Sequence, residues 1–477
     1  MTPPVTIAPR VLWPVLLPTL VLLLMGAPGL GQAGEKPAHS FKDAQAAYDQ
    51  RHYDQALALV EPFTQDGGQG ADALRLKARI LVRLGRPVDA LPVYDQVAAK
   101  LGRDDGPLLH DLAFAFIVAV LKDMREQMRG AGYTALKEVQ SNSNEAIPHF
   151  LDGLSDGSGL VRALAAEGLG RMKPGPHTAR LKKALEDRAA MVRVVVLKAL
   201  GRSGDRAQIP VVEQALKDEQ ATVRVAASGA LVMLGRSEAW NQVRELAEAQ
   251  NPEDRAAALR MLGDLGDRRA LPLLRQALVH TQPSVRGAAA TALGDLKDPA
   301  AAPDLVAALR DPIPGVRASV AVSLGEVAAP ESAAALKDSL LDPNPAVRAA
   351  SVSALLRLGT PFKDVVDTVM ALTRNTDPGI RASVGRALAQ THGKSRTDAV
   401  EVLRLLLEDP LPRPRIAAAR SLGQLSSPEL GQEQLREIIG ILKIGLKDKD
   451  EAVRATVGGA LIRALTAAAP VQPAKGQ

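Results

Sequence analysis

The sequence predicts an all-α protein, most of which is an α-solenoid: a superhelical stack of two-helix repeats preceded by helical hairpins. The main observation is an arginine that recurs every 31 residues from Arg162 to Arg348. A fixed period of this size is typical of a stacked array of repeats. The composition agrees, since 46% of the residues are hydrophobic but only 3% are aromatic, which favours many thin helical layers over one large core.

The aromatic residues also divide the chain into two modules. Eight of the twelve lie between Phe41 and Tyr133, which predicts different cores for an N-terminal module, 40–140, and a long second module, 144–465. The formal charge of +6 is modest for 477 residues. The chain has no cysteine, which excludes disulfides, thiolate catalysis and cysteine-bound metals.

Residues 1–33 are predicted to be a signal peptide. Arg10 precedes an apolar run from Val11 to Met25, and the small residues Gly31 and Ala33 fit the positions before a cleavage point. This pattern predicts an exported, periplasmic protein with no membrane span in the mature chain. The alternative is a retained leader that anchors the protein in the inner membrane and leaves its body facing the periplasm.

In the N-terminal module, two segments, 52–60 and 86–94, repeat at an offset of 34 residues. Ala56 and Ala90 occupy equivalent positions and are small enough to let paired helices approach closely. The pattern resembles tetratricopeptide repeats (TPR), which implies helical hairpins that bind peptides or partner helices. A third unit, Pro107 to Met128, is apolar on all sides, so we expect it to be buried where the two modules meet.

The second module is predicted to hold ten repeats of two helices each. Prolines such as Pro210 and Pro272, fourteen residues before the repeat's arginine, predict the start of the first helix. Glycines such as Gly263 and Gly294 lie near the end of the second helix, where we expect them to terminate it. The ten arginines are Arg162, Arg193, Arg224, Arg255, Arg286, Arg317, Arg348, Arg381, Arg415 and Arg454.

An aspartate stands six residues before the arginine in seven of the ten repeats. Its carboxylate can bond free N–H groups at the start of the second helix or meet an arginine, and stacking would turn these pairs into a ladder. The alternative, that the arginines bind phosphates, is less favoured because the aspartates accompany them. The seven are Asp156, Asp187, Asp218, Asp311, Asp342, Asp409 and Asp448, and the other slots hold Ala249, His280 and Asn375.

The arginine, the aspartate and the Ala-Leu-Gly ending together resemble HEAT-like repeats of the type named after phycobilisome lyases. The resemblance covers about 320 residues and implies an α-solenoid, but the repeat pattern is structural and its members differ in activity. Bilin lyases and the deoxyhypusine hydroxylases, which bind two irons through repeated His-Glu pairs, are the enzymes of this type. The chain has no His-Glu pair, and its nearest approach is a single His110-Asp111.

No nucleotide-binding or nucleophile-elbow motif is present either. The sequence therefore predicts a protein without catalytic residues, cofactor or metal, whose partners are other proteins. An enzyme or enzyme-maturation subunit is the alternative. Nucleic-acid binding is a second alternative, disfavoured by the scarcity of aromatic residues and by mixed charges along the repeats.

The partner surface is predicted on positions five residues after each repeat arginine, which should face the concave side. Four of them are basic, and the competing interpretation is that these are ordinary solvated side chains. They are Lys198, Arg260, Arg386 and Arg420. The final residues, 466–477, are rich in alanine and proline and are expected to be disordered.

Overall fold

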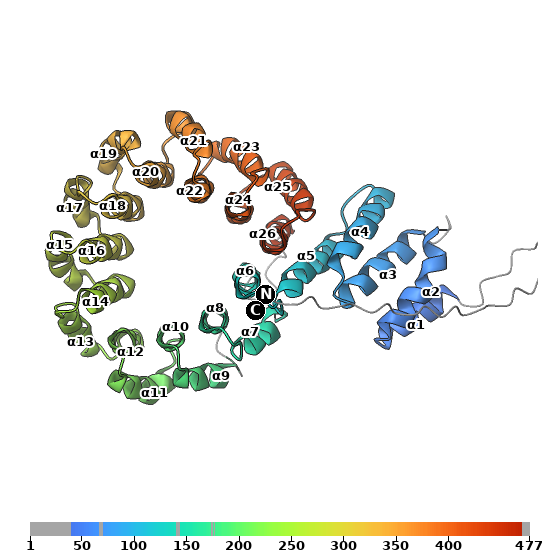
Figure 1. Cartoon of the computed structure of the whole chain (residues 1–477), viewed down its shortest axis with the longest axis horizontal. Helices are drawn as coiled ribbons and strands as arrows, with labels where there is room; N and C mark the ends of the chain where they lie inside the picture. Colours follow the sequence, from blue (N-terminus) through green and yellow to red (C-terminus); the bar gives the residue numbers. More distant parts are fainter. Residues whose placement is uncertain (1–39, 66–69, 140–143, 173–174, 176, 470–477) are drawn as a thin grey trace, which may run out of the picture.

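The computed structural model describes residues 40–65, 70–139, 144–172, 175 and 177–469. Within these ranges the chain forms 26 α-helices and no strand, which confirms the predicted all-α solenoid. Figure 1 shows a ring of paired helices with a smaller helical arm on one side. The predicted signal peptide lies outside the described residues.

The arm consists of α1 (Phe41–Asp49), α2 (Tyr53–Gln65), α3 (Gly70–Arg83) and α4 (Pro87–Leu101), each packed on the next. Ala56 on α2 and Ala90 on α4 are fully buried, as expected for small residues between closely packed helices. The arm joins the ring through α3 and α4, which contact α5 (Gly106–Val120).

The wall of the ring has two layers (Figure 1). The inner layer contains the helices that carry the repeat arginines, and each packs against the inner helix of the next repeat. We call them the inner helices: α6 (Glu126–Leu136), α8 (Gly159–Arg171), α10 (Ala190–Arg202), α12 (Ala221–Met233), α14 (Pro252–Leu265), α16 (Pro283–Leu296), α18 (Pro314–Val327), α20 (Pro345–Arg357), α22 (Pro378–Leu388), α24 (Pro412–Leu425) and α26 (Glu451–Ala468).

The outer layer covers the outward faces of the inner helices. Most of its helices are shorter, and several begin with proline in the first turn, as predicted from the fourteen-residue spacing. These outer helices are α7 (Ala146–Gly153), α9 (Thr178–Lys183), α11 (Ile209–Gln214), α13 (Ala239–Leu246), α15 (Leu271–Leu278), α17 (Ala302–Ala308), α19 (Ala333–Asp338), α21 (Val366–Thr373), α23 (Ser395–Leu407) and α25 (Gln432–Gly445).

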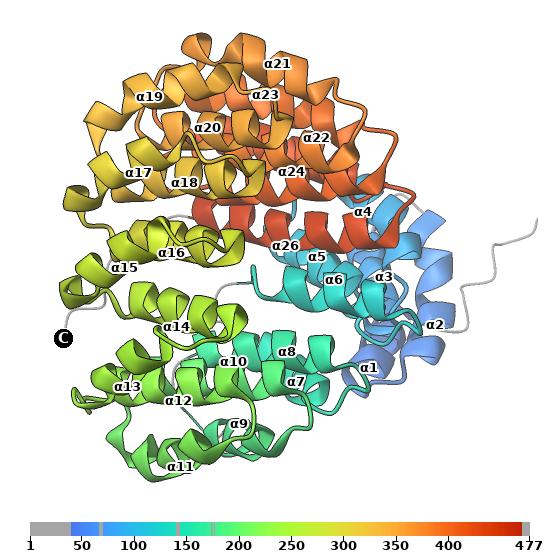
Figure 2. The ribbon, with the colours of Figure 1, turned by 60° about the vertical axis from the view of Figure 1, so that its left-hand side comes forward.

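The stack closes on itself. The last helix, α26, packs against both α5 and α6, and α6 packs in turn against α8, so the inner helices form a complete circle (Figures 1 and 2). We call the contact of α26 with α5 and α6 the seam. The sequence predicts a superhelical stack but contains no periodic signal for this closure.

The repeat glycines have a different role from the predicted one. They do not end the inner helices but lie inside them, where the backbone of the next inner helix approaches. A Cβ built at Gly263 would lie 2.6 Å from the Cα of Ala292, and one at Gly325 would lie 2.8 Å from the Cα of Ala354. The left-handed residue that ends α14 is Gly266, three positions later, with φ of 65°. The glycines therefore set the spacing between repeats.

Two predicted segment boundaries also differ from the structure. The unit expected over Pro107 to Met128 is two helices, because α5 ends at Val120 and α6 begins at Glu126. The start of the predicted disordered tail is wrong, since α26 continues through residues 466–468. Residues 470–477 lie outside the described ranges.

Candidate functional site

The repeat arginines join neighbouring repeats. The Nε and Nη2 atoms of Arg162 donate to the two carboxylate oxygens of Asp187, at 2.6 Å and 2.8 Å. Its Nη1 donates to the backbone carbonyl of Asp156, at 2.8 Å. Asp187 also accepts from the backbone N–H of Ala189, two residues later. Each aspartate thus fixes the turn before its own inner helix and holds the arginine of the repeat before it.

The same fork recurs around the wall. The side chains of these pairs are largely buried, and the hydrogen bonds from Arg162 hold the pKa of Asp187 below its usual range. The structure forms further pairs between the predicted residues: Arg193–Asp218, Arg286–Asp311, Arg317–Asp342, Arg381–Asp409 and Arg415–Asp448. We refer to the arginines and their partners as the ladder.

The ladder has one more rung than the ten-repeat pattern contains. Arg129 on α6 donates to both oxygens of Asp156 and to the backbone carbonyl of Asp123. The sequence contains the pattern of this rung, because Asp123 stands six residues before Arg129, as the aspartates do in the other repeats. It was missed because α6 was assigned to the N-terminal module.

The slots without aspartate show what replaces it. His280 takes the carboxylate's place, with Nε2 at 2.7 Å from Nη1 of Arg255 and Nδ1 accepting from the N–H of Gln282. Arg224 and Arg348 donate only to backbone carbonyls of the turn before their own helix. Arg454, at the seam, donates to the carbonyl of Asp448 and lies 6.0 Å from the ring centre of Phe116.

Ion pairs and glycines hold the seam together. Arg463 on α26 donates to Glu138, just after α6, at 3.2 Å. Beside the seam, Lys447, which precedes α26, lies 2.8 Å from Asp95 on α4. A Cβ at Gly458 would lie 2.5 Å from the carbonyl oxygen of Ala113, and one at Gly459 would lie 2.8 Å from that of Ala135. Only glycine permits α26 to approach α5 and α6 this closely.

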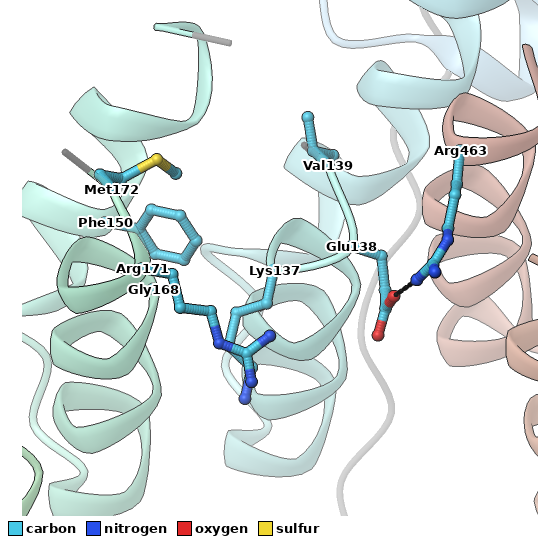
Figure 3. Close-up of a pocket in the computed structure, with 8 residues that line it drawn as sticks. All are labelled: Lys137, Glu138, Val139, Phe150, Gly168, Arg171, Met172 and Arg463. Carbon is cyan, nitrogen blue, oxygen red and sulfur yellow. Dashed lines mark hydrogen bonds and ion pairs between the residues drawn. The ribbon is translucent and has the colours of Figure 1, made fainter. Parts of the chain in front are cut away.

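Behind Arg463 the seam borders a pocket of about 300 Å³, shown in Figure 3. Its walls come from the C-terminal ends of α6 and α8, from α7 and from α26. Lys137 and Arg171 both bond Glu167, at 2.6 Å and 2.7 Å. The cations of this pocket are therefore already paired. The other residues that line it are Glu138, Val139, Phe150, Gly168, Met172 and Arg463.

Exposed residues of the inner helices face the interior of the ring, because outer helices and neighbouring repeats cover the other faces. We call the residues five and nine positions after each ladder arginine the inner surface. Of the four predicted partner contacts, Lys198 is not free: its Nζ lies 2.6 Å from Asp264, reaching across α12. Arg260 is exposed on α14. Arg386 and Arg420 come together on α22 and α24, so only these two form a cluster.

One arc of the inner surface is acidic. Burial, followed by the charges of Asp264 and Glu326, raises the pKa of Asp295 on α16. Asp264 is paired with Lys198, and Glu326 with Arg357 at 2.8 Å. Asp295 forms no ion pair with any residue that the structure describes. We call Asp264, Asp295 and Glu326 the acidic patch.

His110, which the sequence places next to Asp111, lies between two carboxylates. The ring nitrogens of His110 on α5 lie 3.8 Å from Asp111 and 3.3 Å from Glu145. The carboxylates of Asp111 and Glu145 together raise the pKa of His110 to about 9. Over the described ranges, no three His, Asp or Glu side chains are grouped as metal ligands. In the part of the chain that is described, every helix is too short or too polar to span a bilayer.

Comparison with known proteins supports the fold. A family model described as HEAT repeats matches residues 178–251, 241–325, 280–356, 303–389 and 334–423, which together run without a gap through more than half of the chain. No curated protein matches the sequence.

Several solved structures are similar to the chain at low sequence identity. Human deoxyhypusine hydroxylase in complex with glycerol is 24% identical, covers 53% of this chain and 97% of its own, and has a TM-score of 0.29. The CpcE–CpcF complex of phycocyanin lyase from Nostoc sp. PCC7120 is 21% identical over 56% of this chain and 94% of its own, with a TM-score of 0.35. Kap121p bound to Nup53p is 15% identical over 87% and 54%, with a TM-score of 0.34.

Proposed function

Since the chain belongs to the HEAT-repeat family, we propose that it is a non-catalytic scaffold that binds partner proteins through the inner surface of its ring. The observation that carries this proposal is the closure of the stack. Closure brings side chains from every repeat to one enclosed surface, and residues such as Arg260, Thr291 and Val322 are exposed there. A protein segment inside the ring would contact several repeats at once, which favours multisite binding.

Structural and binding roles divide between different positions. Most ladder arginines are bonded to neighbouring repeats, so they are occupied in holding the wall together. The residues of the inner surface vary from repeat to repeat, as expected if they serve recognition rather than stacking. The arm, which resembles tetratricopeptide repeats, is proposed as a second binding module.

Site-specific photo-crosslinking in cells tests this proposal. A photoreactive amino acid at Thr291, which is exposed on α16, is expected to capture a partner protein. The matched control is the same amino acid at Glu331, which is exposed on the outer layer beside α19. Capture from Glu331 but not from Thr291 would contradict binding through the inner surface.

We also propose that the protein acts outside the cytoplasm, on the basis of the leader pattern in residues 1–33. Fractionation and N-terminal sequencing are expected to find a periplasmic chain that begins near Gly34. A chain that starts at Met1 in the membrane fraction would support the retained anchor instead. A chain that starts at Met1 in the cytoplasm would contradict both.

Two further measurements separate the scaffold from its alternatives. Stoichiometric iron or a bound chromophore in the purified protein would indicate an enzyme of the hydroxylase or lyase kind. Salt-sensitive binding of a nucleic acid near physiological ionic strength would indicate a nucleic-acid-binding solenoid. The scaffold proposal predicts neither result.

A further inference from the structure

Three arginines gather on α22 and α24, two from the inner surface and one, Arg413, beside it. Arg413 and Arg420 are seven residues apart on α24, so their side chains leave the helix on the same face. Arg386 leaves the neighbouring helix α22 beside them, near enough for both of their charges to act on it. We call Arg386, Arg413 and Arg420 the basic cluster.

Unlike most arginines of the ladder, none of the three forms an ion pair with a described residue, although the carboxylate of Asp377 lies at the same turn as the guanidinium of Arg413. Nη2 of Arg386 donates to the hydroxyl of Ser383 at 2.6 Å. The guanidinium of Arg413 lies over the first turn of α22, where a Cβ at Gly379 would be 3.1 Å from its Nη1. The Nε of Arg420 is buried and has no hydrogen-bond partner in the described structure.

This arrangement is electrostatically unfavourable when the protein is alone. Partial burial, and then the charges of Arg413 and Arg420, lower the pKa of Arg386. The buried donor of Arg420 is an additional unsatisfied group. An anion would relieve both effects, since it would neutralise the repulsion and accept the free N–H groups.

We propose that the basic cluster is the docking site for the side-chain carboxylates of a short acidic segment of a partner protein. The proposal deepens the proposed function and rests on it, because it names the chemistry that the inner surface recognises. Guanidinium groups bind carboxylates in pairs of parallel hydrogen bonds, as the ladder of this chain does at Arg381 and Asp409. In the complex, the partner's carboxylates would face the guanidinium groups of the basic cluster in the same way as Asp409 faces Arg381 in the ladder.

The acidic patch favours a short peptide over a nucleic acid. Asp295 lies three inner helices before Arg386, and inner helices are spaced about 8–10 Å apart, so about 25–30 Å of wall separates the two charges. A long polyanion that followed the wall from the basic cluster would meet the acidic patch and be repelled. Beyond Phe150 the only aromatic residues are Trp240 and Phe362, which are buried and so do not offer a surface for base stacking.

Fluorescence anisotropy with the full-length protein tests the proposal. The probe is a fluorescein-labelled hexaglutamate peptide, which we expect to bind at low ionic strength and to dissociate as salt is added. Arg386→Gln together with Arg420→Gln is expected to weaken binding about tenfold or more. The control is Arg436→Gln, which removes one exposed charge from the outer helix α25 and should leave the affinity unchanged.

Charge reversal keeps the test independent of stability. The Arg386→Glu and Arg420→Glu double variant is expected to lose hexaglutamate and to bind a labelled hexalysine peptide instead. Unchanged hexaglutamate affinity in the Gln variant would overturn the proposal, as would equal or tighter binding of a thymidine oligonucleotide of the same charge. If Thr291 captures a partner in cells but hexaglutamate does not bind, this inference fails while the proposed function stands.

Discussion

At the scale of single residues, the ladder arginines act as connectors. A guanidinium has five N–H donors in a planar fork, and Arg317 uses it on both oxygens of Asp342 and on the carbonyl of Asp311. One side chain therefore binds the turn of its own repeat and the carboxylate of the next. An arginine that lacks such an aspartate, such as Arg348, keeps only the bonds to its own turn, so it serves as a control for the contribution of the carboxylate.

Replacing Arg317 by alanine is expected to lower the free energy of unfolding by about 3 kcal/mol, because it leaves the mostly buried Asp342 without its cation. Arg348→Ala is the matched control. Its slot holds Asn375, and Arg348 bonds only backbone carbonyls, so the expected loss is about 1 kcal/mol. Urea unfolding of both variants measures the difference. Equal losses would show that the carboxylate contributes little.

The ladder also predicts a loss of stability in acid. Hydrogen bonds from Arg317 lower the pKa of Asp342, so the folded state binds the proton more weakly than the unfolded chain. The resulting stability is present above the unfolded pKa of about 4 and is lost as the pH falls further, through the folded pKa. Urea midpoints measured between pH 6 and pH 2 should decrease most steeply below about pH 4. Asp342→Asn should make that decrease shallower, and an unaltered slope would contradict the assignment.

At the scale of helices, glycine determines how closely successive inner helices pack. The backbone of α16 lies where a side chain of Gly263 on α14 would be, so the two helices are in contact through their main chains. Gly287 on α16 is different, because a Cβ there would meet no atom within 4 Å. The two positions separate the role of packing from the intrinsic helix propensity of glycine.

We expect Gly263→Ala to destabilise the protein by about 1–3 kcal/mol, since the added methyl group forces backbone apart in a packed layer. Gly287→Ala should have the opposite sign and stabilise α16 by up to about 1 kcal/mol, because alanine favours the helix. Thermal unfolding followed by circular dichroism compares the two. If both substitutions stabilise the protein, the result would contradict the close approach of α16 to Gly263.

The elements themselves were largely predictable from the sequence. The 31-residue period places both helices of most repeats, and the prolines mark where several outer helices begin. The role of the glycines was not predictable, because an Ala-Leu-Gly ending fits both a helix terminus and a close contact with the next repeat. The partner of each aspartate was also open, since its arginine lies 25 residues earlier in Arg162–Asp187 and 33 residues earlier in Arg415–Asp448.

At the scale of the whole molecule, closure converts a stack into a ring. Gly458 and Gly459 are consecutive and face α5 and α6, so a single pair of residues allows the last helix to meet the first inner helix. Such a contact is specific to two places in the chain and does not repeat, which is why periodicity does not reveal it. The basic cluster was hidden for a related reason: Arg413 is outside the predicted five-residue stripe and joins Arg386 and Arg420 only through the packing of α22 on α24.

Crosslinking across the seam tests the ring directly, and the absence of native cysteine makes introduced pairs unambiguous. Glu138→Cys with Arg463→Cys replaces an ion pair between residues 325 positions apart. With a short bismaleimide, this pair is expected to crosslink within one molecule, as read by mass spectrometry of the joined peptides. Glu138→Cys with Asp295→Cys, on distant repeats of the ring, should remain unlinked. A seam pair that reacts no faster than this control would show that the ring is open in solution and would contradict the closure of α26 on α5 and α6.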